Sequence, residues 1–234
     1  MQVTAEKILF LDIETVPRWA NYDDMTDDFR RLWDHKTNYI KSSPEDTPRS
    51  LFPKAGIYAE FGKIICISTG FFHQNMFRIK SFYGDDEKIL LEDFKIMIER
   101  MYSSQPYQLA AHNGKEFDFP YISRRMLVNE ISLPDIFDNS GKKPWETSFI
   151  DTMEMWKFGD YKHYTSLALL SALFNIPSPK GDIDGSQVAS VYYIDNDLKR
   201  IVRYCQNDVL TLARVFCKIK GLPSPTDDQV IIID

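Results

Sequence analysis

The sequence has little of what marks membrane, secreted or disulfide-bonded proteins. No stretch approaches the ~18 uninterrupted apolar residues of a membrane span, and the N-terminus runs directly into an acidic, strand-like segment instead of a signal peptide. The three cysteines have no CxxC spacing and lie in apolar segments, which argues against a disulfide framework and a thiolate zinc site. We therefore expect a cytoplasmic protein that binds no membrane.

Positive charge is also scarce. The chain has 28 Lys and Arg against 34 Asp and Glu, a formal net charge of −6 with the four histidines neutral. This balance argues against a tight, non-specific polyanion binder with a wholly basic face. A local nucleic-acid groove is still compatible with it, because metal ions in an acidic centre supply positive charge that a residue count omits.

The remaining composition is that of a globular chain. Hydrophobic residues make up 44% and charged residues 26% of the 234 residues, which are ordinary values for a folded domain. We predict a single domain over residues 1–221, interrupted by an insertion at about 18–56 and followed by a tail at 222–234. The insertion has a helical pattern around 22–38 and then a Ser/Pro-rich stretch.

The order of predicted elements indicates a mixed α/β fold. Residues 7–16 are apolar at both odd and even positions, which predicts a central strand that is covered on both faces. Residues 62–72 and 75–83 predict an antiparallel hairpin, and 107–113 a further short strand. Residues 148–152 fit either a strand or a loop. Helices are predicted at 87–102, 118–129, 165–174 and 195–221. The result is a mixed sheet of about five strands flanked by helices.

Two acidic residues interrupt the predicted central strand. Asp12 and Glu14 are two positions apart, so both side chains leave the same face of the sheet. Acidic side chains are almost never fully buried unless they are paired or bound to a metal. In the alternative interpretation they are two solvated acids at an exposed strand end. The central-strand pattern favours a site.

The last predicted helix carries a third acid on its core-facing stripe. Asp208 lies in the middle of that stripe, with Tyr204 one turn earlier. An aspartate facing a core calls for a cation, although it could also reach sideways to Arg203 or cap a neighbouring helix. The apolar residues of the stripe are Ile201, Cys205, Leu212, Val215 and Ile219.

Asp118 is the fourth candidate. It precedes Phe119-Pro120 at a helix start, where an aspartate is as easily an N-cap as a site residue. Four carboxylates gathered in one place would repel one another by roughly 1 kcal/mol per close pair in water, and about 4 kcal/mol at an effective dielectric constant near 20. Oxygen ligands of this kind select Mg²⁺ or Mn²⁺, so the pattern predicts a two-metal phosphodiester site.

Three segments carry a family resemblance. LDIET (11–15), NGKEFD (113–118) and YCQND (204–208) resemble, in order and content, the motifs of the DnaQ-like DEDD superfamily of 3′→5′ exonucleases, tyrosine subclass, which have a ribonuclease H-like fold. The resemblance implies two divalent cations, Mg²⁺ or Mn²⁺. It implies that four acids hold them and that a tyrosine orients the attacking water: Asp12, Glu14, Asp118, Asp208 and Tyr204. The residues implied to contact the terminal nucleotide are Ile13, Thr15, Asn113, Phe117 and Tyr204.

Within that superfamily the chain is most similar to the exonuclease domains of family B DNA polymerases, here without a polymerase. This likeness implies a free-standing nuclease that removes nucleoside 5′-monophosphates from single-stranded or frayed DNA 3′ ends, in repair or in proofreading supplied in trans. Two alternatives stay open. One is a 3′ exoribonuclease of the same fold, and the other is a catalytically silent nucleic-acid-binding module.

Other signals have ordinary structural explanations. We expect His112 and His163 to be structural or to lie at the substrate's edge, and Asp151 to be either a support for the site or a loop-end cap. The tail at 229–234 adds an edge strand, docks onto a protein partner or frays. Basic pairs that could flank a groove, more often a solvated face, are Arg30-Arg31, Arg124-Arg125, Lys142-Lys143 and Lys199-Arg200. Aromatic residues that could stack on bases, more often core, are Trp19, Trp33, Phe71 and Phe72.

Overall fold

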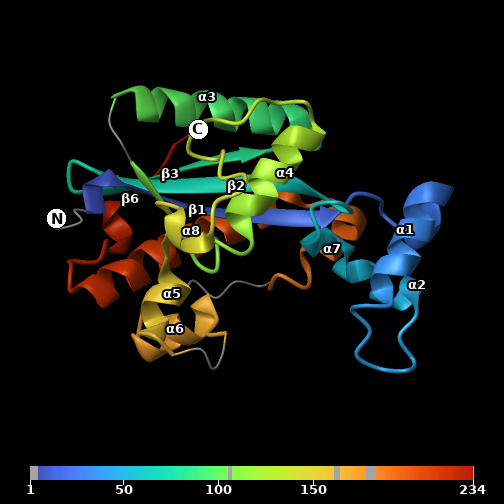
Figure 1. Ribbon diagram of the computed structural model, residues 1–234. Helices are drawn as coiled ribbons and strands as arrows, with labels where there is room; N and C mark the ends of the chain where they lie inside the picture. Colours follow the sequence, from blue (N-terminus) through green and yellow to red (C-terminus); the bar gives the residue numbers. More distant parts are fainter. Residues whose placement is uncertain (1–4, 105–106, 161–163, 178–182, 234) are drawn as a thin grey trace.

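The computed structural model describes residues 5–104, 107–160, 164–177 and 183–233. A six-stranded mixed sheet forms the centre of the molecule, with helices on both faces (Figure 1). Its strand order is β5-β4-β1-β2-β3-β6. The strands are β1 (Ile8–Pro17), β2 (Gly62–His73), β3 (Met76–Tyr83), β4 (Gln108–Ala111), β5 (Ile150–Asp151) and β6 (Val230–Ile233).

The sheet confirms the predicted mixed α/β architecture. β1, β2 and β3 are antiparallel neighbours, whereas β4 runs parallel to β1 and β5 parallel to β4. Gln74 and Asn75 join β2 to β3 with φ of 51° and 61°, the left-handed backbone that a two-residue hairpin turn requires. β6 pairs in parallel with β3, so the C-terminal segment adds an edge strand, the first of the three alternatives for this tail.

Helices form the outer layers. α3 and α4 lie on one face of the sheet and α8 on the other (Figure 1). The helices are α1 (Asp27–Thr37), α2 (Pro48–Leu51), α3 (Glu87–Ser104), α4 (Asp118–Val128), α5 (Thr152–Lys157), α6 (Leu167–Leu173), α7 (Val188–Ser190) and α8 (Leu198–Lys220). A 3₁₀ helix, η3 (Phe52–Ile57), and a π-turn, η5 (Val191–Asp195), also occur. The predicted long helices are confirmed, while α2, α5, α7, η3 and η5 were not predicted. Among the described residues, no helix is both long and apolar enough to cross a bilayer.

β1 is covered on both faces, as its composition predicts. Leu9, Leu11 and Ile13 pack under α3 and α4, whereas Ile8 and Phe10 pack under α8. The two acids of β1 therefore lie on the α8 side, because side chains alternate along a strand. The apolar cores on the two faces of the sheet fix the position of β1 between the helices.

The predicted insertion forms a small lobe of its own at one end of the sheet, seen as α1 and α2 in Figure 1. We call residues 18–56 the insertion lobe. Trp33 is completely buried there, and its indole N–H donates to the Pro48 carbonyl at 2.8 Å. Trp19 packs against the same cluster, and Phe71 and Phe72 pack against the cores on either side of the sheet. Trp33 is therefore a core residue, and the other three are partly buried against the cores. The predicted domain boundaries themselves stay a prediction.

Candidate active site

β1 positions the first two acids. Asp12 and Glu14 project from the same face toward α8, and the β1–β2 register shifts between Glu14 and Thr15. Such a bulge twists a strand locally and re-aims its side chains, which is common next to active sites. Glu14 is 7% exposed, and β1 continues to Pro17. The alternative of two solvated acids at an exposed strand end is therefore wrong.

Asp118 reaches the same strand from α4. The helix begins at Asp118 and its N-cap is Phe117, so the predicted alternative of an Asp118 N-cap is not what the structure has. The Asp118 carboxylate instead accepts a hydrogen bond from the Ile13 N–H at 3.2 Å. Asp118 is 3% exposed. This contact joins the second motif directly to the first, 105 residues earlier.

The turn before α4 is held by Asp151. Its carboxylate accepts hydrogen bonds from the N–H groups of Asn113 at 3.0 Å and Lys115 at 3.1 Å, and also caps α5 through the Met153 N–H at 2.9 Å. Asn113 is left-handed, with φ of 61°. At Gly114 an added Cβ would lie 2.3 Å from the Ala111 side chain, so only glycine fits. Asp151 is thus a cap that also fixes the second motif.

α8 supplies the remaining predicted residues. Tyr204 and Asp208 are one turn apart on the same helix face, and the Tyr204 hydroxyl donates a hydrogen bond to the Asp208 carboxylate. Asp197 caps the N-terminus of α8, and Gly221, with φ of 65°, ends it. The helix therefore extends almost as predicted.

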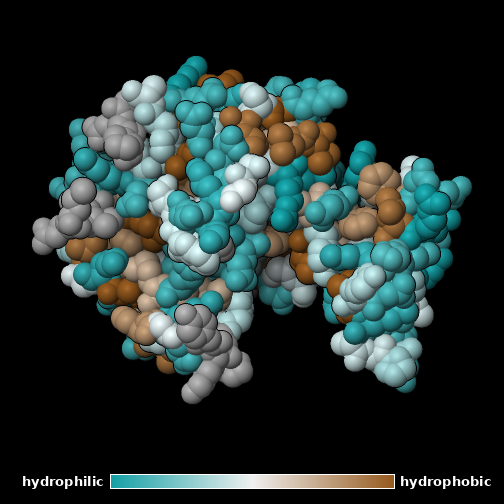
Figure 2. Space-filling model, viewed as in Figure 1, coloured by the Kyte–Doolittle hydropathy of each residue, from teal (hydrophilic) through white to brown (hydrophobic). Residues whose placement is uncertain are grey.

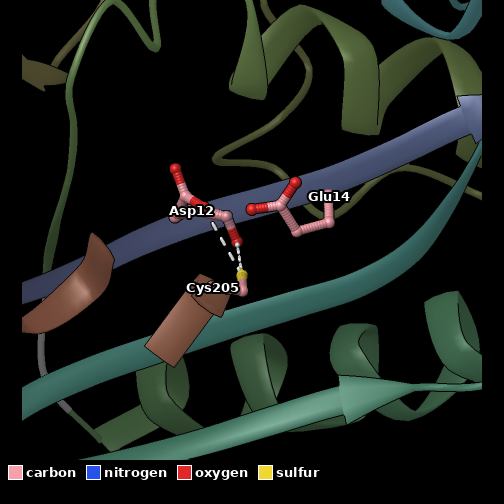
Figure 3. A group of neighbouring side chains, drawn as sticks. All are labelled: Asp12, Glu14 and Cys205. Carbon is pink, nitrogen blue, oxygen red and sulfur yellow. Dashed lines mark hydrogen bonds between the residues drawn. The ribbon is translucent and has the colours of Figure 1, made fainter. Parts of the chain in front are cut away.

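Cys205 is a site residue that the sequence did not reveal. Its Sγ lies 3.4 Å from both the carbonyl oxygen and the Oδ2 atom of Asp12 (Figure 3). Ligand-type atoms of Asp12, Glu14 and Cys205 all lie within 4.8 Å of one another. The sequence placed Cys205 on the apolar stripe of α8. Its position three residues before Asp208 was the available signal, since residues at that spacing share a helix face.

The four carboxylates gather at one place, where Glu14 and Asp118 are buried and Asp12 and Asp208 are half-buried. Loss of contact with water is the main cause of their pKa shifts. Burial raises the pKa of Asp12, and the carboxylates of Asp118 and Asp208 raise it further. Burial likewise raises the pKa of Glu14, with Asp12 adding to the effect. It raises the pKa of Asp118 to about 7 and that of Asp208 to about 6. In the part of the chain that the structure describes, no lysine or arginine forms an ion pair with any of these acids. This set of oxygen donors fits hard divalent cations.

The pKa of Tyr204 is also raised, and for a phenol this favours the protonated form. Burial, followed by the charge of Asp208, raises the pKa of its phenol. The hydroxyl is therefore protonated at neutral pH and serves as a hydrogen-bond donor. A phenol of this kind cannot act as the base in a reaction at neutral pH.

One cavity of about 980 Å³ contains the whole predicted set. The predicted residues that line it are Asp12, Ile13, Glu14, Thr15, Asn113, Phe117, Asp118, Tyr204 and Asp208. His112 also lines it, but its ring is held by Thr152 Oγ1 at 2.8 Å and by the Thr165 carbonyl at 2.7 Å. His112 is therefore held in a structural role at the edge of the cavity, which fits both of the roles expected for it. His163 lies outside the described residues.

Comparisons with known proteins identify a family and a similar fold. A family model described as "Predicted 3'-5' exonuclease related to the exonuclease domain of PolB" matches residues 57–229. This range contains Asp118, Tyr204 and Asp208 and begins after Asp12 and Glu14. No curated protein matches the chain.

The fold is similar to that of the family B DNA polymerase from the hyperthermophilic archaeon Pyrobaculum calidifontis, with a TM-score of 0.55 and 13% sequence identity. The match covers 90% of this chain and 24% of the polymerase chain, so the likeness concerns about a quarter of that enzyme. It shows the ribonuclease H-like fold of polymerase exonuclease domains. The chain belongs to the family of predicted 3′-5′ exonucleases related to the exonuclease domain of PolB.

Proposed function

We propose that this protein is a metal-dependent 3′→5′ exonuclease acting on single-stranded DNA and frayed DNA 3′ ends. One observation carries the proposal. Carboxylates from β1, α4 and α8 line a single cavity, and no cationic side chain of the described residues neutralises them. The family supports the class of reaction. The substrate, the number of metal ions and the roles of individual residues are our additions.

Two Mg²⁺ or Mn²⁺ ions would be held by the side chains of Asp12, Glu14, Asp118 and Asp208. The donor set supports this, because all four are carboxylates and burial raises the pKa of each. Raised pKa values mean that the charged forms are costly in this pocket without a counter-ion. When bound, such ions lower the pKa of a coordinated water and stabilise charge on the phosphate oxygens.

Tyr204 and the acids then act by positioning. The protonated Tyr204 hydroxyl, anchored to Asp208, orients the water that attacks the terminal phosphorus. The new bond joins the water oxygen to phosphorus, and the bond between phosphorus and the 3′ oxygen breaks. The departing 3′ oxygen takes up a proton in place of the one that the attacking water loses. The shortened strand therefore ends in a 3′-hydroxyl, and the released nucleotide carries the 5′-phosphate.

Residues of the second motif would hold the terminal nucleotide. The Asn113 side-chain oxygen is buried and has no hydrogen-bond partner among the described residues, although Asn113 lines the cavity. A substrate donor such as the 3′-hydroxyl would satisfy it. Phe117 packs against Tyr121 at 5.4 Å between ring centroids, which fixes an apolar wall for the base. The Thr15 hydroxyl forms a hydrogen bond with Tyr121. Thr15 would therefore contact the substrate DNA through its backbone and not through its side chain.

A nuclease assay tests the proposal. Oligonucleotides labelled at the 5′ end, one DNA and one RNA, are incubated with Mn²⁺ or with EDTA, using the native protein and Asp12→Asn. We expect a DNA ladder that disappears with EDTA and with Asp12→Asn. A ladder on RNA alone would show the exoribonuclease instead. No ladder together with no Mn²⁺-induced rise in melting temperature would show a silent module.

A further inference from the structure

The insertion lobe contributes one side of the acidic cavity. Pro53, Lys54 and Gly56 of the lobe, and the adjoining Ile57, line this cavity. All four lie on η3, and we call them the η3 wall. Figure 2 shows the lobe standing apart from the rest of the molecule across a hollow. The wall joins the lobe to the site, although the family model begins only at residue 57.

The η3 wall is rigidly attached to β1. An added Cβ at Gly56 would lie 2.9 Å from the Val16 carbonyl carbon and 3.0 Å from the Pro17 nitrogen, so the two backbones touch. The Tyr121 hydroxyl donates to the Gly56 carbonyl at 2.7 Å and also bonds to Thr15. The wall is therefore held at a fixed place just beyond Glu14 on β1.

The wall also carries positive charge into an acidic cavity. Among the described residues that line the cavity, Lys54 is the only lysine or arginine. It is exposed, and no carboxylate of the described chain forms an ion pair with it. The pKa of nearby Asp46 is lowered first by the Ser42 and Ser43 N–H groups and only last by Lys54. Its ammonium group is thus free to bind an external anion. The acids that line the same cavity are Asp12, Glu14, Asp118, Asp184 and Asp208.

An apolar side chain lies beside this cation. Ile57 is 53% exposed although it lines the cavity. A strand of nucleic acid presents the matching chemistry, because it alternates charged phosphates with sugars and bases. Metal ions neutralise the centre of the site, but neighbouring phosphates of the strand would still meet a negative wall. Lys54 is placed to compensate one of them.

We propose that the η3 wall is a strand-binding site, in which Lys54 contacts a backbone phosphate of the substrate and Ile57 packs against the adjoining sugar or base. The inference rests on the proposed nuclease function and gives the insertion lobe a role in holding the strand. Lys54 is a positioning residue here, since it lies on the wall and not among the acids.

The test compares Lys54→Ala and Lys54→Glu with Lys41→Ala, a matched control on an exposed lobe residue that does not line the cavity. Fluorescence anisotropy measures the Kd of a 5′-fluorescein oligothymidylate at several salt concentrations in EDTA, and the nuclease assay gives kcat and KM. We expect Lys54→Ala to raise Kd and KM about fivefold and to reduce the slope of log Kd against log salt by about 0.7, the value for one phosphate contact to a single strand. Lys54→Glu should raise both further, with kcat retained.

Two results overturn the inference. Either both Lys54 variants keep the native Kd, KM and salt slope, or Lys41→Ala changes them equally. Melting temperatures of the variants show whether the fold is intact. If the native protein cleaves DNA and the Lys54 variants keep its Kd and KM, the strand-binding role of the η3 wall is refuted while the nuclease function stands. Oligonucleotide binding that depends on Lys54 without cleavage refutes the nuclease alone, and absence of both binding and cleavage refutes the two together.

Discussion

Two buried glutamates of this protein have the same exposure and opposite surroundings. Glu14 on β1 and Glu87 at the start of α3 are each 7% exposed. The Glu87 carboxylate accepts hydrogen bonds from Arg125 Nε at 2.9 Å, Arg125 Nη2 at 2.6 Å and the Ile64 N–H at 2.7 Å. Glu14 instead faces Asp12 and Asp208, whose charges add to the effect of burial in raising its pKa.

We propose that this difference separates a structural acid from a functional one. A buried ion pair satisfies itself within the fold, and removing one partner leaves an uncompensated charge. A buried group of like charges stays unsatisfied until a cation arrives from outside. The Arg124-Arg125 pair, one candidate for a strand-binding groove, illustrates the first case, because Arg125 is buried against Glu87. The two buried arginines of the described residues, Arg125 and Arg214, pair with Glu87 and Asp227, and neither lines the acidic cavity.

The largest effect should come from the acids of the cavity. Asp12→Asn and Glu14→Gln are expected to reduce nuclease activity by at least about 10²-fold, because each removes one of the charged oxygen ligands that we propose for the metal ions. Their melting temperatures in EDTA should equal or exceed that of the native protein, since a source of like-charge repulsion is gone. Calorimetry and the labelled-oligonucleotide assay measure the two quantities. A large loss of stability of these variants in EDTA would show that Asp12 and Glu14 have a structural role, as Glu87 does.

Glu87→Ala should produce the converse result. We expect the free energy of unfolding to fall by about 3–5 kcal/mol, because Arg125 is left buried without its partner. Urea denaturation measures this change. The activity per folded molecule should stay near that of the native protein. Glu87→Gln, which keeps one acceptor oxygen, is the milder matched variant and should lose less stability.

The pH dependence of stability in EDTA should show the uncompensated acids. Burial raises the pKa of Asp118 from the ordinary 3.8 to about 7. Between these values the folded chain binds more protons than the unfolded chain, so stability falls as pH rises from about 4 to about 7 and then levels off. The melting temperature should drop by several degrees over this range, at roughly 2–4 °C per kcal/mol. Asp118→Asn should flatten the curve, and an unchanged slope in that variant would contradict this assignment.

The smallest predicted effect concerns Cys205. Its thiol lies within hydrogen-bonding distance of Asp12, and this contact lowers the pKa of Asp12 against the larger effect of burial. Cys205→Ala should raise the Mn²⁺ concentration for half-maximal activity by about 3–10-fold, whereas Cys205→Ser, which keeps a donor, should restore most of it. Cys217→Ala is the control for loss of a buried thiol elsewhere in α8. Equal effects of Ala and Ser at position 205 would show that only packing matters.

The sequence predicted those parts of the site that periodicity controls. Asp12 and Glu14 stand out because they interrupt a strand that is apolar at both odd and even positions. Asp208 stands out because it interrupts an apolar stripe of a helix. The second motif was ambiguous alone. Its role depends on the Asp118–Ile13 contact between residues 105 positions apart, which no local pattern encodes.

The features that the sequence did not predict depend on tertiary contacts or lie in very short elements. Short elements such as α5 and η3 have too few residues to show a period. Asp151 clamps the Asn113 turn from 38 residues away, and Tyr121 fixes the η3 wall from 65 residues away. Cys205 looked like an ordinary apolar residue, because a thiol next to a carboxylate is visible only once β1 and α8 are packed together.

Titration of the native protein with Mn²⁺, followed by the electron paramagnetic resonance of free Mn²⁺, tests the central claim most directly. The account predicts saturable binding near pH 7.5 that is lost or strongly weakened in Asp12→Asn and unchanged in Glu87→Gln. Absence of saturable binding in the native protein, or equal binding by Asp12→Asn, would contradict it.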